Sequence, residues 1–161
     1  MSLTIREARP GDAALVLRFV RELAEYEREP DAVVATEPML EEALFGANPR
    51  IFCDIAEWNG EPAGVTVWFY NFSTWLGRHG IYLEDFYVTP AMRGRGIGRA
   101  LMARLARRCV DEGLERMDWA VLTWNEPAIA IYRGLGAYAN EQWGMWRLTG
   151  EALDRLAGET S

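Results

Sequence analysis

Residues 81–105 read Ile81-Tyr82-Leu83-Glu84-Asp85-Phe86-Tyr87-Val88-Thr89-Pro90-Ala91-Met92-Arg93-Gly94-Arg95-Gly96-Ile97-Gly98-Arg99-Ala100-Leu101-Met102-Ala103-Arg104-Leu105. An apolar strand therefore breaks into a loop rich in glycine and arginine, and this loop opens a helix. Backbone N–H groups and the positive end of the helix dipole converge at such a junction and favour an anion. The segment predicts a phosphate-binding loop, with an ordinary strand-to-helix turn as the alternative.

The composition and the glycine spacing limit which phosphate-containing ligands this loop can bind. All 17 basic residues are arginine, so the lysine of a P-loop is absent. A dinucleotide-binding turn needs a third glycine three residues after its close pair, and the chain has Arg99 or Leu101 at that place. The remaining pattern is Arg93-x-x-Gly96-x-Gly98, whose alternate glycines and leading arginine suit a pyrophosphate.

Length and composition set further bounds. A chain of 161 residues that is half hydrophobic predicts one domain over residues 1–161. The absence of a long apolar stretch, and of an apolar leader in residues 1–7, predicts a cytoplasmic protein without membrane contact. Cys53 and Cys109 lack a metal-ligand spacing, and His79 is the single histidine, so no metal site is expected.

The charges are unevenly distributed. The net charge of −7 argues against nonspecific binding of nucleic acid. Acidic residues gather in 22–31, whereas arginines gather in 93–108 beside the glycine loop. An anionic ligand therefore favours the second region and a cationic ligand the first, although a solvated helix face would also explain the acidic run.

The hydrophobic patterns predict an α+β fold, with a mixed, largely antiparallel central sheet flanked by helices. Asn59-Gly60 is a strong hairpin signal between two of the strands. The expected strands are 3–6, 51–58, 63–72, 81–88, 116–123 and 143–148, and the expected helices are 13–26, 39–45, 96–112, one from about 125 to 134, and 150–157.

Four segments together resemble the GNAT family of N-acetyltransferases, and within it the diamine (spermidine/spermine) and thialysine acetyltransferase branch. They are the loop Arg93-Gly94-Arg95-Gly96-Ile97-Gly98, and the stretches Glu22-Leu23-Ala24-Glu25-Tyr26-Glu27, Tyr82-Leu83-Glu84-Asp85-Phe86-Tyr87-Val88 and Trp124-Asn125-Glu126-Pro127-Ala128-Ile129-Ala130-Ile131-Tyr132. The resemblance covers nearly the whole chain. It implies the GNAT fold, acetyl-CoA as cosubstrate and a homodimer.

The resemblance also implies how acetyl-CoA is held. The strand ending at Val88 pairs with the pantetheine arm, backbone amides of residues 94–99 hold the pyrophosphate, and residues 125–128 add contacts. For Asn125 a simple helix-capping role is the alternative, and both roles are compatible. The implied cofactor-binding residues are Phe86, Tyr87, Val88, Arg93, Gly94, Arg95, Gly96, Ile97, Gly98, Arg99, Asn125, Glu126, Pro127 and Ala128.

Two residues are expected to carry the proton transfers. Tyr132 matches the tyrosine that the family places near the thioester sulfur, where a phenol can protonate the leaving thiolate. An alkyl ammonium has a pKa of about 10.4, so a carboxylate facing the amine must accept a proton before attack. Glu84 is predicted to be this base, directly or through water, and Asp85 a charge on the substrate side. The alternative for either acid is an ion pair with an arginine.

The amine site is expected to include Glu84, Asp85, Tyr26, Glu27, Trp75 and Trp146, which match substrate-contacting positions of the branch. The chain departs from the polyamine enzymes at two places. Ser73-Thr74 stands where those enzymes have an acid-proline pair, and Gly144-Met145 replaces acidic residues before the last tryptophan. A site lacking these charges should hold a long polycation less well, which favours a diamine or a lysine-like amino acid.

The sequence therefore predicts an N-acetyltransferase that transfers acetyl from acetyl-CoA to a primary amine of a small cationic substrate: a diamine, a polyamine or a lysine-like amino acid. A CoA-binding module without turnover is one alternative, because a fold does not fix a function. Acetylation of a protein amine is another, although the tryptophan-rich segment 68–75 suggests a closed site for a small molecule.

Overall fold

The computed structural model describes residues 1–159. They fall into two compact units, Met1–Leu122 and a second unit that begins at Thr123. Within residues 1–159, no helix is both long and apolar enough to cross a membrane. The expectation of one domain over residues 1–161 stays a prediction.

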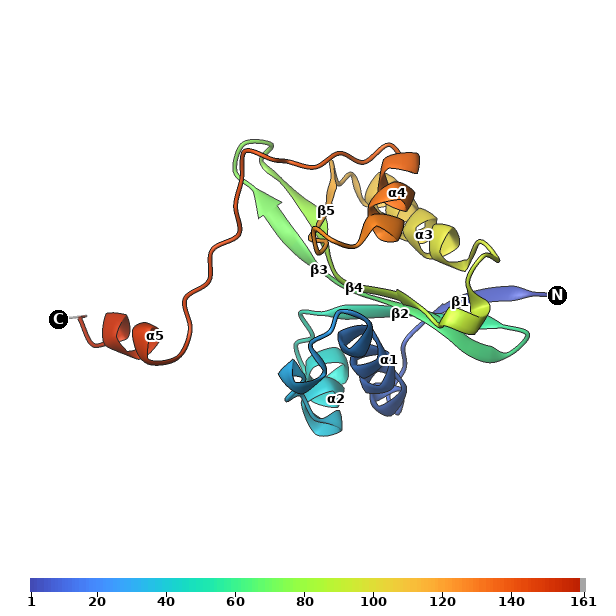
Figure 1. Cartoon of the computed structure of the whole chain (residues 1–161), viewed down its shortest axis with the longest axis horizontal. Coiled ribbons are helices and arrows are strands. Elements are labelled where there is room, and N and C mark those ends of the chain that lie inside the picture. Colours follow the sequence, from blue (N-terminus) through green and yellow to red (C-terminus); the bar gives the residue numbers. More distant parts are fainter. Residues whose placement is uncertain (160–161) are drawn as a thin grey trace. The chain divides into compact units, whose positions relative to one another are not determined.

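The first unit is built on a five-stranded sheet in the order β1-β2-β3-β4-β5 (Figure 1). The strands are β1 (Leu3–Glu7), β2 (Phe52–Trp58), β3 (Glu61–Ser73), β4 (Arg78–Val88) and β5 (Met117–Trp119). The first four pair antiparallel, and β5 pairs parallel with β4. Asn59 and Gly60 both have positive φ, as a tight hairpin between β2 and β3 requires. The predicted mixed, largely antiparallel sheet is confirmed.

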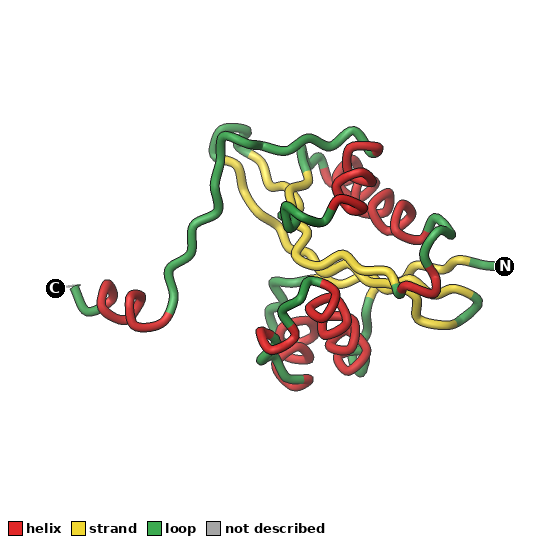
Figure 2. The backbone as a smooth tube through the Cα atoms, in the orientation of Figure 1, coloured by secondary structure: helices red, strands yellow, loops and turns green. Residues whose placement is uncertain are grey.

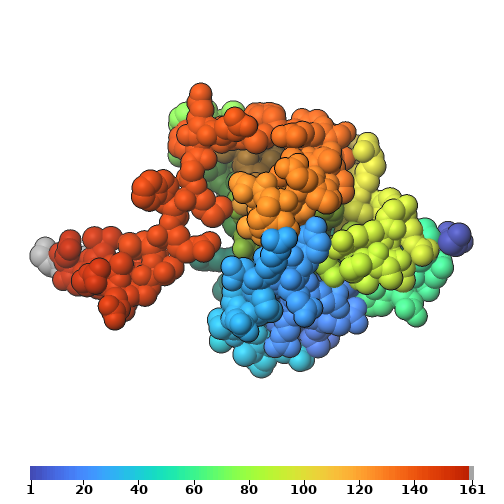
Figure 3. All heavy atoms as spheres, in the orientation of Figure 1, coloured from blue at the N-terminus to red at the C-terminus, as the bar shows by residue number. Residues whose placement is uncertain are grey.

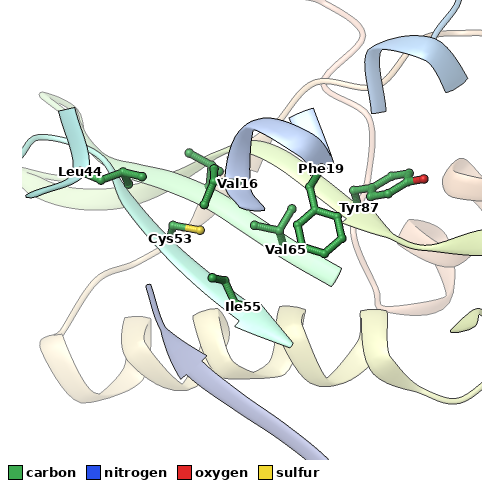
Figure 4. Close-up of a cluster of buried hydrophobic side chains, with 8 residues drawn as sticks. Val16, Phe19, Leu44, Cys53, Ile55, Val65 and Tyr87 are labelled. Atoms are coloured by element: carbon green, nitrogen blue, oxygen red, sulfur yellow. The ribbon is translucent and has the colours of Figure 1, made fainter. Parts of the chain in front are cut away.

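Helices cover both faces of this sheet (Figures 1 and 2). They are α1 (Ala13–Tyr26), α2 (Glu37–Phe45) and α3 (Ile97–Glu112), with short 3₁₀ turns at Pro30–Ala32 and Pro90–Met92. On one face, α1 and α2 pack on the central strands, and Figure 4 shows Val16 and Phe19 of α1 beside Val65 and Tyr87 of the sheet. On the other face, α3 buries Leu101 against the sheet.

The first turn of α3 is held firmly against β4. Ile97 and Leu101 are fully buried, and a Cβ at Gly98 would lie 3.0 Å from the Phe86 ring, so any larger residue would require that ring to shift. A buried carboxylate adds a polar anchor, because Asp54 of β2 pairs with Arg104 of α3 at 3.1 Å. The start of α3 is therefore fixed relative to the strand that precedes it.

The second unit contains α4 (Glu126–Gly134) and α5 (Gly150–Ala157). The Asn125 side chain accepts a hydrogen bond from the Ala128 N–H at 3.4 Å, and Pro127 stands in the first turn, as the sequence predicts. Two strand predictions need correction. Residues 143–148 form no strand in the described chain, and the strand expected over 116–123 is only Met117–Trp119. Alternating apolar residues make a strand only where a neighbouring strand pairs with them, and none pairs with 143–148 in residues 1–159.

Candidate functional site

Two glycines of the glycine-rich loop adopt a left-handed backbone conformation. Gly94 and Gly96 have φ of 77° and 79°, a left-handed conformation that glycine adopts without strain. Gly96 is the N-cap of α3 and has no side chain, so the first N–H groups of the helix have no side-chain acceptor. α3 is 16 residues long, and its dipole adds partial positive charge at this end. The segment containing the loop lies at the surface (yellow-green in Figure 3).

Arg93 connects this loop to two other elements. Its Nε donates a hydrogen bond to the Val88 carbonyl at 2.9 Å. Its guanidinium also lies over two rings, 5.1 Å from the centroid of Tyr26 and 5.7 Å from that of Tyr87. Arg95 lies over Trp58 at 5.4 Å. The arginines that bracket the glycines are therefore held by aromatic faces on α1, β4 and β2.

A bulge in β4 places the two predicted acidic residues. Val67 of β3 pairs with Asp85, but the next residue, Trp68, pairs with Leu83, so Glu84 is an extra residue in β4. Asp85 shares the face of Val67, which packs under α1, whereas Leu83 shares the opposite face with Trp68. The bulge thus turns Asp85 toward α1 and leaves Glu84 exposed beside it.

Three carboxylates lie near enough to one another here to interact electrostatically. Burial, together with the charges of Glu84 and Glu27, raises the pKa of Asp85 to about 6. Burial also raises the pKa of Glu27, which follows the last residue of α1. Within residues 1–159, no arginine or histidine forms an ion pair with any of the three. The alternative of an arginine-paired acid is therefore rejected in the described chain, and the site is electrostatically prepared for a cation.

The edge of β4 nearest the bulge is open. β5 pairs with only three residues of β4, and the last pair is Leu83 with Trp119. From Glu84 to Val88, β4 therefore pairs with β3 on one side alone in the described chain. An extended ligand can add to such an edge through backbone hydrogen bonds. This open edge runs directly from the carboxylates to the residues before the glycine loop.

The remaining predicted residues fall into two groups. Tyr26 belongs to the first unit and contacts Arg93, next to Glu27. Asn125, Glu126, Pro127, Ala128 and Tyr132 belong to the second unit, where Tyr132 is half-buried on α4. Their roles in catalysis and cofactor binding stay predictions.

The two tryptophans predicted for the amine site are exposed. Trp75 is 86% exposed on the turn between β3 and β4, and Trp146 is 95% exposed in the irregular segment 143–148 of the second unit. Trp75 is separated from Asp85 by most of β4, roughly 20 Å of strand. In the first unit, the structure brings together Tyr26, Glu27, Glu84 and Asp85, but leaves Trp75 apart from them.

Tyr82 was missed by the sequence analysis. It shares a face with Phe69, and their ring centroids are 5.1 Å apart. Burial raises the pKa of its phenol, and the charges of Glu84 and Asp118 raise it further. A strand without a bulge would give Tyr82 the face opposite to Asp85, so alternation alone could not associate them. No group of three or more His, Cys, Asp or Glu that could hold a metal ion occurs in residues 1–159.

Several known proteins resemble this chain in sequence or in structure. Residues 17–137 match the profile described as Acetyltransferase (GNAT) family. A thialysine N-epsilon-acetyltransferase from Sus scrofa is 42% identical, over 98% of this chain and 99% of the relative. A spermidine/spermine N(1)-acetyltransferase-like protein 1 from Homo sapiens is 34% identical, over 96% of this chain and 24% of the relative. An integron cassette protein from V. cholerae has a similar structure, with a TM-score of 0.80, 26% identity and 98% of each chain covered.

The partly buried carboxyl at Asp85 should lower stability at neutral pH. Below about pH 4 the Asp85 carboxyl is protonated in both the folded and the unfolded state. Between about pH 4 and pH 6 the unfolded state releases this proton while the folded state keeps it. The free energy of unfolding therefore falls as pH rises through this range. We expect Asp85→Asn to raise the free energy of unfolding above pH 6 by up to about 3 kcal/mol. Urea unfolding at pH 4 and pH 7.5 measures the difference. The exposed Asp111→Asn should show no gain, and equal stabilities of Asp85→Asn and wild type at pH 7.5 would contradict the burial argument.

Proposed function

The chain belongs to the acetyltransferase (GNAT) family, and we propose that it transfers the acetyl group of acetyl-CoA to a primary amine of a small cationic substrate. The favoured substrates are a lysine-like amino acid or a diamine. The observation that carries this proposal is the electrostatic effect of Glu84 and Glu27 on Asp85, with no ion pair to any of the three in residues 1–159. An ammonium group would supply the missing positive charge.

The glycine loop and the open edge of β4 support the cosubstrate assignment. The amides of residues 94–99 suit the pyrophosphate of acetyl-CoA, because Gly94 and Gly96 leave them open to an anion. The edge from Phe86 to Val88 suits the amide groups of the pantetheine arm, which would pair with it like an added strand. In this arrangement the thioester would approach the carboxylates at the bulge.

The reaction needs two proton transfers. The bound ammonium must first lose a proton, at a cost of about 4–5 kcal/mol near pH 7, and we assign this proton to Glu84. The free amine then attacks the thioester carbonyl, and a backbone N–H near Val88 stabilises the oxyanion. The carbon–sulfur bond breaks, and Tyr132 returns a proton to the thiolate. The resemblance to the family supports the roles of Tyr132 and of residues 125–128.

Two wider properties are also proposed: a homodimer, which rests on the resemblance, and a cytoplasmic location, which rests on the apolar pattern of the sequence. For the homodimer, the apolar side chains of Trp143, Met145 and Trp146 add support. These side chains are 67%, 69% and 95% exposed. Apolar side chains grouped at a surface favour contact with another protein molecule.

The activity is tested by release of free thiol from acetyl-CoA in the presence of diamines, polyamines, lysine analogues and aminoglycosides. We expect release with short diamines or lysine-like amino acids and weaker release with spermine. No release with any amine, while acetyl-CoA still binds, would favour a CoA-binding module instead.

The acid role is tested by Tyr132→Phe. Because the variant lacks only the phenolic oxygen, acetyl-CoA should bind with unchanged affinity while kcat falls by about 10²-fold or more. Calorimetry and the thiol assay measure the two quantities. A wild-type kcat at all pH values would refute the assignment.

The base role is tested by Glu84→Gln. The variant should lose most activity at pH 7, by roughly 10- to 100-fold, and recover part of it near pH 10, where the free amine exists without a base. The pH dependence of kcat/KM measures this effect. If Asp85→Asn produced this profile and Glu84→Gln did not, the two carboxylates would exchange roles.

A further inference from the structure

A second polar group lies on the same face of the sheet as Asp85, where β4 meets β5. Arg116 Nε is 3.0 Å from Asp118 Oδ2, and Asn71 Nδ2 donates to the same oxygen at 3.1 Å. The side chains come this close because Gly80 has no Cβ, which would lie 2.8 Å from both the Arg116 carbonyl and Asn71 Oδ1. We refer to the cluster of Arg116, Asp118 and Asn71 as the head group site.

The contacts inside the head group site leave ligand-binding atoms available. Both partners use Oδ2 of Asp118, and Arg116 uses only Nε. Within residues 1–159, Oδ1 of Asp118 and the two Nη groups of Arg116 therefore have no protein partner. Both side chains are close to half exposed, at 48% for Arg116 and 43% for Asp118. The site thus offers one acceptor for a cation and two donors for an anion side by side.

An aromatic surface connects this site to the three carboxylates. Tyr82 pairs in register with Asp118 on one side and with Phe69 on the other, and its ring stacks on Phe69. Tyr82 pairs with Phe69 and Asp85 with Val67, two residues apart on the unbulged strand β3, so about 7 Å of sheet separates Tyr82 from Asp85. This distance is comparable with the extended length of a lysine-like amino acid from its carboxylate to its side-chain nitrogen.

We propose that Arg116, Asp118 and Asn71 bind the α-amino-carboxylate head of a lysine-like amino acid, whose side chain lies along Tyr82 and whose terminal amine reaches Asp85 and Glu84. The proposal rests on the proposed function and names its substrate class. The guanidinium of Arg116 pairs with the α-carboxylate, and Asp118 with the α-ammonium.

Arg116 would make a diamine or a polyamine a weaker ligand than a lysine-like amino acid, even though Asp118 attracts the distal ammonium. A molecule with an ammonium at each end has no carboxylate for Arg116, and its distal cation would meet the guanidinium as a like charge. Such a repulsive element separates substrates that share the reacting amine. The head group site is therefore a specificity device, whereas the carboxylates at the bulge recognise the amine common to all of them.

Three substrates test the recognition of the α-carboxylate and of the α-ammonium separately. Lysine has both charged groups, 1,5-diaminopentane lacks the carboxylate, and Nα-acetyl-lysine lacks the α-ammonium. For Arg116→Gln, we expect KM to rise at least tenfold for lysine and Nα-acetyl-lysine and to stay equal or fall for 1,5-diaminopentane. For Asp118→Asn, KM should rise for lysine and 1,5-diaminopentane but not for Nα-acetyl-lysine. In both variants kcat should change less than twofold.

Controls distinguish a local effect from a folding defect. Arg116→Lys should restore part of the lysine KM because it keeps the charge, and Arg107→Gln on the exposed face of α3 should change none of the three KM values. Thermal unfolding checks that each variant is folded. An equal rise in KM for all three substrates with Arg116→Gln, or no change for lysine, would overturn the proposal while leaving the acetyltransferase assignment intact.

A separate measurement distinguishes failure of the head group site from absence of acetyltransferase activity. If wild type releases no thiol with any amine, lysine binding in the presence of CoA is measured by calorimetry for wild type and Arg116→Gln. Weaker lysine binding by the variant supports the head group site, and equal or absent binding refutes it.

Discussion

The extra residue at Glu84 is the constraint on which the site depends. Without it, β4 would alternate regularly, and Asp85 would share a face with Leu83 in the core under α3. The insertion puts the Asp85 carboxyl under α1 beside Glu27, and keeps Glu84 at the strand edge. It also comes where β5 stops pairing with β4. One local irregularity therefore determines where the carboxylates lie and stands at the start of the open edge.

Local sequence signals predicted the features that depend on neighbours in the chain. The loop at Gly94 and Gly96, the Asn59-Gly60 hairpin and the Asn125 cap follow from the conformations and hydrogen bonds that these residue types favour. Features that depend on a residue far away in the sequence were harder to predict. The bulge is a matter of register between β3 and β4, and nothing in residues 81–88 alone reveals that Trp68 pairs with Leu83. The expected strand at 143–148 was wrong for a related reason, since an apolar alternation does not supply its own partner.

The distribution of ion pairs separates structural charges from functional ones. Arg6 joins Asp12 and Glu57, and Arg104 joins Asp54, so these pairs fasten β1, α1, β2 and α3 to one another. Burial raises the pKa of Asp54, but Arg104 opposes that effect. Asp85 is partly buried and has no such ion pair in the described chain, which makes the folded chain less stable than it could be at neutral pH. A destabilised charge of this kind marks a place where a ligand completes the electrostatics.

The open edge of β4 has a consequence for solubility as well as for ligand binding. A row of unpaired N–H and C=O groups can template the addition of a strand from another molecule and so begin aggregation. Here the edge starts with an exposed carboxylate on a bulged residue, Glu84, and ends where Arg93 occupies the Val88 carbonyl. The charge of Glu84, the irregular spacing at the bulge and the occupied Val88 carbonyl all disfavour the addition of a regular strand from another protein molecule. The edge thus discourages self-association by a flat strand while remaining available to a shorter, flexible molecule.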